Sequence, residues 1–330
     1  MPTRSGVDVA ADPVRPTPDG FAADVRYFLT QQPRQLPSRY LYDDLGSALF
    51  EAITLLPWYG LSRAELRLLR AHARTIFDAL GRAHVTLIEL GPGNGTKLAA
   101  FLAARDPAGP DVSIHLVDVS THALTRAAQT VQQARSTDVR THAATYEDGL
   151  VELAPEIDES GGVLVLFLGS NIGNFDPPGC RAFLRTVRAA LRPGDALLLG
   201  ADLVKPARRL LLAYDDPPGV TAAFNRNLLV RLNRELGADI DPRAFDHRAV
   251  WNADDSRVEM HLVSTGQYRI VIPRADVDIV LAAGETIWTE SSYKYEPHTL
   301  DRLLREAGFE PARMWIDEAD RFALALASVR

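Results

Sequence analysis

A strand pattern that breaks into a glycine-rich turn organises this chain. The apolar run over residues 85–90 predicts a buried strand, and residues 97–104 after the turn have a helical pattern. The turn contains three glycines, Gly91, Gly93 and Gly95. Glycine lets the backbone approach a ligand closely, and the free N–H groups and positive dipole end of the following helix point to the same place. The pattern is typical of the first turn of an α/β unit that binds a dinucleotide or a nucleoside.

The spacing of the glycines separates two kinds of cofactor. A nicotinamide-binding loop has its third glycine where this chain has Thr96. Here the third glycine comes earlier, and Glu89 precedes the turn, so the string Glu-x-Gly-x-Gly-x-Gly is similar to the S-adenosylmethionine loop of class I methyltransferases. The next expected strand ends in Asp118, whose carboxylate can accept hydrogen bonds from ribose hydroxyls. An ordinary tight turn remains the alternative for the glycines alone, but Glu89 and Asp118 together favour cofactor binding.

The composition limits the class of partner. A formal net charge of -7 argues against nucleic acid, because proteins that bind it usually present a basic surface. Cys180 is the only cysteine, which excludes an internal disulfide, and no histidines form a helical pair at metal-ligand spacing. No apolar run is long enough to span a bilayer. We therefore expect a cytoplasmic monomer that acts on a small molecule, with no nucleic acid, membrane or metal partner.

Strand and helix patterns alternate regularly through the middle of the chain. The expected strands lie near residues 85–90, 113–118, 138–144, 162–168 and 195–201. Such alternation predicts an α/β fold with a doubly wound, Rossmann-like sheet of the class I methyltransferase kind, in which ligands bind at the carboxyl ends of the strands where the strand order reverses. The first and fourth strands should flank that position.

A second, mixed α+β segment follows the fifth strand. A long helical stripe with Phe224 and Leu228 precedes strand patterns at 248–252 and 257–264, with further strands after them. This segment is too long to be a loop, so we expect a second lobe, with which the early helices of residues 21–60 pack. Residues 1–20 are expected to form a flexible tail.

Two local patterns place polar side chains near the expected ligand sites. After the fourth strand, Asn171 or Asn174 would lie beside a transferable methyl group, although either could be an ordinary turn residue. Ser62 and Glu65 form a capping box that would begin a long helix.

A third pattern lies on a strand of the second segment. Trp288, Glu290 and Ser292 alternate, so all three side chains should face one way. A carboxylate beside a hydroxyl in a half-buried site would recognise an imidazole or an ammonium group. An edge strand whose polar residues face water is the alternative.

Several longer strings occur in one order along the chain. They are Tyr42-Asp43-Asp44-Leu45-Gly46-Ser47, Leu56-Pro57-Trp58-Tyr59, Gly169-Ser170-Asn171-Ile172-Gly173-Asn174-Phe175, Tyr214-Asp215-Asp216, Phe224-Asn225-Arg226-Asn227 and Glu290-Ser291-Ser292-Tyr293. From about residue 21 to the C-terminus, the chain resembles the histidine-specific Nα-methyltransferases of ergothioneine biosynthesis. The resemblance implies trimethylation of the α-amine of L-histidine to hercynine, with S-adenosylmethionine as the methyl donor. Another amino acid or small amine as acceptor, and a cofactor-binding regulatory module without catalysis, are the alternatives.

The resemblance implies a division of the chain into a substrate-binding lobe of 21–62 plus 205–294 and a methyltransferase domain of 63–204 plus 295–330. It also implies roles for individual residues. By position, Gly91, Lys97 and Asp118 match residues that bind the cofactor. Tyr59, Asn174 and Tyr214 match residues that hold the histidine backbone, and Glu290 and Ser292 match those that contact the imidazole. Tyr42, Phe50 and Met260 match residues that line the pocket. Tyr59 and Asn174 are the candidates for orienting the amine during catalysis. The chain departs from the family pattern at Gly60, where a second tyrosine is common. It also departs at the run containing Tyr146, which we include among the cofactor residues in place of an acidic adenine contact.

Overall fold

The computed structural model describes residues 18–330 except for 135–137, 155–156 and 158–160. The described residues form two compact units. The first contains the described residues up to Gly60, Asn174–Asp176 and Lys205–Tyr293, and the second contains Leu61–Gly173, Pro177–Val204 and Lys294–Arg330. The tail expected over residues 1–20 lies outside the described residues as far as residue 17, and the first helix begins at Pro18.

The second unit is built on a seven-stranded sheet in the order β12-β13-β6-β5-β2-β3-β4. Its strands are β2 (His84–Leu90), β3 (Asp111–Asp118), β4 (Val139–Ala143), β5 (Gly162–Phe167), β6 (Ala196–Asp202), β12 (Glu310–Asp317) and β13 (Phe322–Ser328). Neighbours from β4 through β6 are parallel, whereas β13 pairs antiparallel with β6 and β12. The strand order reverses between β2 and β5, the first and fourth expected strands, which confirms the doubly wound fold.

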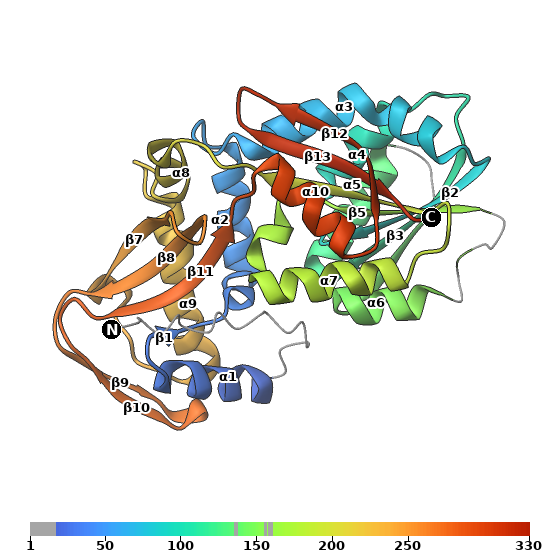
Figure 1. The fold of residues 1–330 in the computed structure, drawn as a ribbon. Helices are drawn as coiled ribbons and strands as arrows, with labels where there is room; N and C mark the ends of the chain where they lie inside the picture. Colours follow the sequence, from blue (N-terminus) through green and yellow to red (C-terminus); the bar gives the residue numbers. More distant parts are fainter. Residues whose placement is uncertain (1–17, 135–137, 155–156, 158–160) are drawn as a thin grey trace. The chain divides into compact units, whose positions relative to one another are not determined.

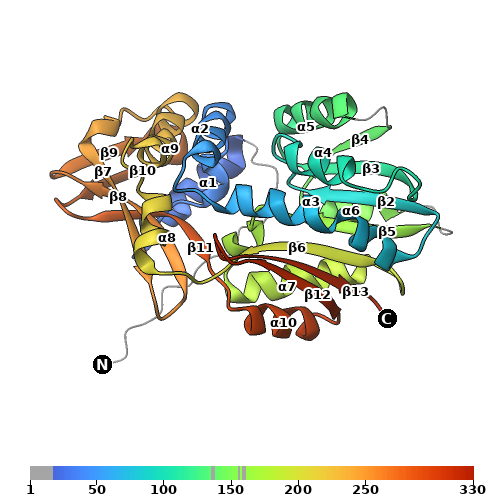
Figure 2. The same ribbon diagram turned by 90° about the horizontal axis from the view of Figure 1, so that it is seen from above.

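Helices cover both faces of this sheet (Figure 2). One face carries α3 (Leu61–Leu80), α4 (Thr96–Ala103) and α5 (Thr121–Ala134), and the other carries α6 (Tyr146–Leu153), α7 (Pro177–Ala189) and α10 (Pro297–Glu306). Strands β5 and β6 are buried along their whole length. A parallel strand covered on both faces is apolar throughout rather than alternating, which is why these runs were recognisable in the sequence.

The first unit contains a smaller sheet in the order β1-β11-β8-β7 and a separate two-stranded hairpin (Figure 1). The strands are β1 (Arg34–Gln35), β7 (Phe245–Asn252), β8 (Arg257–Ser264) and β11 (Thr286–Tyr293), with β9 (Tyr268–Ile272) and β10 (Val277–Leu281) in the hairpin. Strands β7 and β8 pair antiparallel around the expected turn. Residues 277–293 contain two strands, β10 and β11, separated by a turn at Gly284.

The helical part of the first unit packs on this sheet. It consists of α1 (Pro18–Thr30), α2 (Asp44–Leu55), α8 (Ala207–Tyr214) and α9 (Val220–Leu236), with short 3-10 turns η1 (Ser38–Leu41), η4 (Pro242–Ala244) and η5 (Pro273–Ala275). Helix α2 begins at Asp44, because the Asp43 side chain accepts a hydrogen bond from the Gly46 N–H and caps the helix. None of the helices in the part of the chain that the structure describes has the length and apolar character of a membrane span.

Candidate active site

The glycine turn after β2 uses its glycines for different reasons. Gly91 has φ +71, and a Cβ there would lie 2.8 Å from the Tyr146 hydroxyl and 2.9 Å from the Asn171 side-chain nitrogen. At Gly95, with φ +77, a Cβ would lie 2.7 Å from the backbone oxygen of Ala127 on α5. Gly95 therefore permits close packing of α5 against the turn, whereas Gly91 keeps space beside two polar side chains.

Two acidic residues lie at the ends of adjacent strands beside this turn. Burial raises the pKa of Asp118, at the end of β3, to about 6, although backbone N–H groups of Ser120 and Val119 lower it. Glu89 on β2 is 1% exposed, and its Oε2 has no hydrogen-bond partner among the described residues. Burial raises the pKa of Glu89 to about 8, against the nearby positive charge of Lys97. Glu89 is thus a buried carboxyl that a cation would ionise.

Glu65 contacts both the first turn of α4 and the loop after β5. Glu65 was expected in a capping box, but α3 already begins at Leu61. The Glu65 carboxylate is fully buried; it accepts hydrogen bonds of 2.8 and 3.0 Å from the Gly169 N–H and lies 2.6 Å from the Nζ of Lys97. Glu65 therefore fixes two loops at the carboxyl edge of the sheet. Both partners are distant in sequence, so the capping-box spacing could not reveal them.

Tyr146 occupies the first turn of α6. Thr145 caps this helix by accepting a hydrogen bond from the Asp148 N–H. The Tyr146 ring packs edge-on against Phe167 at 5.5 Å and lies 6.0 Å from Phe183, and burial raises its pKa. The core thus anchors the ring and leaves the hydroxyl at the glycine turn.

An aromatic cluster in the first unit brings together three of the expected substrate-binding residues. Tyr42 lies 5.5 Å from Phe50, and Phe50 lies 6.1 Å from Tyr59, both edge-on. Phe224 of α9 completes the cluster, 5.4 Å from Tyr42 and 6.0 Å from Phe50. From the sequence, Phe224 belongs to a core stripe and to one of the family strings, and it is not among the expected pocket residues. Electron-rich ring faces of this kind attract cations.

Strand β11 carries the two expected imidazole contacts. Ser292 accepts a 2.8 Å hydrogen bond from the Tyr214 hydroxyl, which is buried. Glu290 is 8% exposed and lies opposite Met260 on β8. Since residues 290 and 292 alternate regularly on the strand, Glu290, Ser292 and Met260 share one face of the sheet.

Trp288 does not share that face, so the expectation for it was wrong. A register shift between Trp288 and Glu290 makes Thr289 an extra residue, and Trp288 lies opposite His261 while Glu290 lies opposite Met260. The Trp288 ring stacks on His261, and the guanidinium of Arg257 lies 4.5 Å above it. One inserted residue therefore sends the tryptophan and the carboxylate to opposite sides of the strand.

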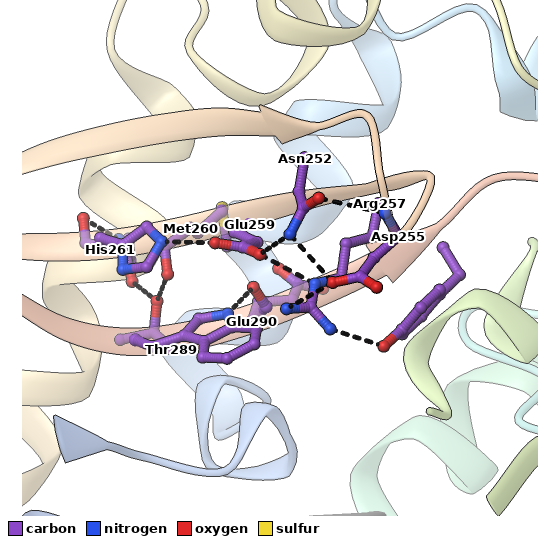
Figure 3. A network of polar contacts seen from close by, with 11 residues as sticks. Asn252, Asp255, Arg257, Glu259, Met260, His261, Thr289 and Glu290 are labelled. Carbon is purple, nitrogen blue, oxygen red and sulfur yellow. Dashed lines mark hydrogen bonds and ion pairs between the residues drawn. The ribbon is translucent and has the colours of Figure 1, made fainter. Parts of the chain in front are cut away.

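The opposite face of the sheet holds a polar network of its own (Figure 3). Glu259 accepts hydrogen bonds from Arg257 at 2.8 Å and Asn252 at 3.0 Å, and contacts His261 at 3.1 Å. Burial opposes ionisation of Glu259, but these hydrogen bonds and the Arg257 charge bring its pKa down to about 2. The Arg257 guanidinium also donates a 2.7 Å hydrogen bond to the Tyr293 hydroxyl. This network holds β7, β8 and β11 together behind Glu290.

Asn174 ends the short turn η3 (Asn171–Asn174) after β5 and is half-buried. It belongs to the first unit, whereas Asn171 belongs to the second. The structure thus brings together Gly91, Tyr146 and Asn171 in one unit, and Tyr42, Phe50 and Tyr59 in the other.

Comparison with known proteins gives a consistent set of relatives. A family model described as "Histidine-specific methyltransferase, SAM-dependent" matches residues 21–329. The chain is 42% identical to a histidine N-alpha-methyltransferase of Mycobacterium tuberculosis (strain CDC 1551 / Oshkosh), over 92% of this chain and 94% of that protein. It is 41% identical to a histidine N-alpha-methyltransferase of Mycolicibacterium smegmatis, over 94% and 95%. It is also 30% identical to ergothioneine biosynthesis protein 1 of Neurospora crassa, over 86% of this chain and 32% of that protein.

Proposed function

The chain belongs to the family of S-adenosylmethionine-dependent, histidine-specific methyltransferases, and we propose that it methylates the α-amine of L-histidine. The observation that carries this proposal is the family match over residues 21–329, together with relatives above 40% identity that align over nearly their whole length. Three successive transfers would yield hercynine, as the first step of ergothioneine biosynthesis. Histidine is thus the acceptor to test first.

The second unit has the groups that a cationic adenosyl cofactor requires. We assign the methionyl part to the turn at Gly91, Gly93 and Gly95, where the unpartnered Oε2 of Glu89 would favour a positive charge nearby. Asp118 would accept hydrogen bonds from the ribose hydroxyls. Lys97 acts in this assignment through its ion pair with Glu65, which fixes the adjacent loops. Tyr146 is assigned beside the turn because its hydroxyl lies next to Gly91.

The first unit has the groups that an amino acid with an imidazole side chain requires. Glu290 supplies a carboxylate that accepts a hydrogen bond from an imidazole N–H, and Ser292 supplies a hydroxyl beside it. Tyr214 would hold the amino-acid backbone, and Met260, opposite Glu290, would line the pocket. A buried polar group that loses its partner is costly, so this arrangement rejects side chains that cannot donate to Glu290.

The chemistry asks little of the protein beyond alignment and removal of a proton. S-adenosylmethionine supplies a methyl group on a sulfonium that needs no further activation. The α-ammonium of the acceptor has to lose a proton before its nitrogen can attack, and a group that ionises only slightly above physiological pH does not need a strong base for this. We assign orientation of the amine lone pair to Tyr59 and Asn174. The aromatic cluster of Tyr42, Phe50 and Tyr59 would stabilise the permanent positive charge of the trimethylated product.

The test is incubation of the purified protein with methyl-labelled S-adenosylmethionine and a panel of free amino acids, followed by mass analysis. We expect methylation of L-histidine at the α-amine, with singly and doubly methylated forms converted to the trimethylated product. Imidazole lacking the amino-acid backbone should not be methylated. Absence of histidine turnover, or faster turnover of another amino acid, would overturn the proposed acceptor.

A further inference from the structure

The direction of Glu290 depends on the bulge at Thr289, and a buried side chain holds that bulge. The Thr289 hydroxyl lies 2.7 Å from Oδ1 of Asn225 and 3.0 Å from the backbone oxygen of Met260. Thr289 is 1% exposed and Asn225 is inaccessible to solvent. The extra residue that turns Glu290 toward Met260 is therefore tied to helix α9 inside the protein.

Asn225 is bonded to all three long strands of the sheet. Its side-chain nitrogen donates to the backbone oxygen of His261 on β8 at 3.2 Å, and lies 3.0 Å from Nδ1 of His247 on β7. Its oxygen accepts from Thr289 on β11. These partners settle the orientation of the amide, because only the nitrogen can donate to the His261 carbonyl.

This orientation also settles the chemical form of His247. Since the Asn225 nitrogen donates, Nδ1 of His247 has to accept and carries no proton. Its Nε2 then donates to the backbone oxygen of Tyr214 at 2.7 Å. The Tyr214 hydroxyl in turn donates to Ser292. Hydrogen bonds thus link Thr289, next to Glu290, through Asn225 and His247 to the backbone of Tyr214, and the side chain of the same tyrosine bonds Ser292.

We propose that Asn225 is a positioning residue for recognition of the amino-acid substrate. It fixes the bulge that directs Glu290, and through neutral His247 it fixes Tyr214 relative to Ser292. The proposal rests on the proposed function of Glu290, Ser292 and Tyr214 as substrate contacts. It gives a role to the string around Asn225, which no proposed substrate or cofactor contact uses.

The network requires His247 to stay neutral, so the groups around His247 that shift its pKa matter. Burial is the largest influence on the pKa of His247 and lowers it. Arg226 of α9 lowers it further, while Asp215, Asp216 and the Tyr214 carbonyl favour the charged form; on β8, the residue opposite His247 is apolar Leu262. Protonation would place a hydrogen on Nδ1, facing the Asn225 amide hydrogens, and break the hydrogen bond there.

Two substitutions at Asn225 and one control separate positioning from general stability. Asn225→Leu removes all the hydrogen bonds of the side-chain amide and keeps a similar side-chain volume. Asn225→Asp keeps an acceptor for Thr289 but cannot donate to the His261 oxygen or to His247, so the contact with His247 re-forms only when His247 is protonated. The matched control is Asn233→Leu on the same helix, because the Asn233 side-chain amide makes its hydrogen bonds to the backbone of Ile240 instead. All proteins are compared in full length by denaturant unfolding, KM for L-histidine and Kd for S-adenosylmethionine.

For Asn225→Asp, KM for histidine should rise about tenfold near pH 8, and the ratio to wild type should shrink toward pH 6. Comparing both proteins at each pH cancels the titration of the substrate imidazole. The cofactor Kd should change by less than about twofold. Ring nitrogen-15 shifts of His247, assigned by their loss in His247→Gln, should report the Nε2–H form in the wild type and the doubly protonated ring in Asn225→Asp near pH 7.

These measurements test the positioning role of Asn225 separately from the proposed function. An unchanged histidine KM in Asn225→Asp, a pH-independent ratio, or equal losses of histidine and cofactor affinity as in a merely destabilised variant would overturn the positioning role. If Asn225→Leu does not fold, Asn225→Asp decides alone. A wild type that does not methylate histidine would refute the proposed function, and the His247 spectrum would still test the network itself.

Discussion

The ammonium of Lys97 lies 2.6 Å from the carboxylate of Glu65, a residue that is fully buried on a different helix. The same carboxylate accepts two hydrogen bonds from the Gly169 N–H. Helix α4 follows β2 and Gly169 follows β5, so this one side chain joins the loops of the two strands between which the strand order reverses. The geometry of the proposed cofactor site therefore depends on a residue outside it.

Glu65→Ala should lower the free energy of unfolding by about 3 kcal/mol, because it leaves the Gly169 N–H and the partly buried Lys97 without their acceptor. It should also weaken S-adenosylmethionine binding, since both loops lose their anchor. Urea unfolding and calorimetric titration measure the two effects. Glu152→Gln, at an exposed position of α6, is the control and should stay within about 0.5 kcal/mol of the wild type. A similarly small change in Glu65→Ala would show that the pair is unimportant.

Glu89 should make the stability of the protein without cofactor depend on pH. Its pKa of about 8 in the folded protein exceeds the ordinary 4.5, so the folded state keeps a proton that the unfolded state has lost. The resulting stabilisation is present below pH 4.5 and is lost as the pH rises through 8, by at most about 1.4 kcal/mol per pH unit. Glu89→Gln lacks this contribution, so the unfolding free energies of the two proteins should diverge with pH. Parallel curves would contradict the raised pKa.

Cofactor binding should displace that proton. A positive charge placed near the Glu89 carboxyl lowers its pKa, so binding near pH 7 should release protons to the buffer. Titration calorimetry in buffers of different ionisation enthalpy measures the number released. The wild type should release up to one proton and Glu89→Gln fewer. Equal proton release by both proteins would place the positive charge elsewhere.

The pKa of Asp118 near 6 predicts a pH effect on cofactor affinity. An ionised carboxylate is the better acceptor for ribose hydroxyls, so cofactor affinity should fall as the pH drops through about 6. Asp118→Asn should bind S-adenosylmethionine at least about tenfold more weakly near pH 7.5 and show little further loss at lower pH. Asp111→Asn, at the exposed start of the same strand, should match the wild type. An unchanged cofactor affinity in Asp118→Asn would remove Asp118 from the site.

Much of the fold was predictable because buried positions are occupied by apolar residues in recognisable patterns. The strand β5 reads Gly-Val-Leu-Val-Leu-Phe and is buried throughout, as a strand in a parallel sheet must be. The stripe of Phe224, Leu228, Leu232 and Leu236 on α9 is likewise buried. These signals are local, so the order of elements and the parallel sheet follow from them. Tyr42, Phe50 and Tyr59 were assigned to the substrate site from the family resemblance rather than from a sequence pattern.

The parts that were mistaken depend on contacts distant in sequence. Alternation placed Trp288 beside Glu290, but nothing local reveals that Thr289 is an inserted residue, because the bulge is held by Asn225 of another helix. Glu65 matched a capping box in spacing, yet its carboxylate is bonded to Gly169. A polar residue within an apolar helix face is the signal that could have been read differently, as a buried group that needs a partner.

Glu290→Ala should weaken histidine binding while cofactor binding survives. Removal of a buried carboxylate leaves the imidazole N–H without an acceptor, so kcat/KM for L-histidine should fall about a hundredfold or more. Glu290→Gln keeps an acceptor without the charge, so its kcat/KM should lie between those of the wild type and Glu290→Ala. Ser291→Ala is the matched control, because Ser291 lies opposite Glu259 and so faces away from Met260 on the same strand. Calorimetry with each ligand separately measures both affinities. Equal loss of histidine and cofactor affinity in Glu290→Ala, or a comparable loss in Ser291→Ala, would refute imidazole recognition by this face of β11.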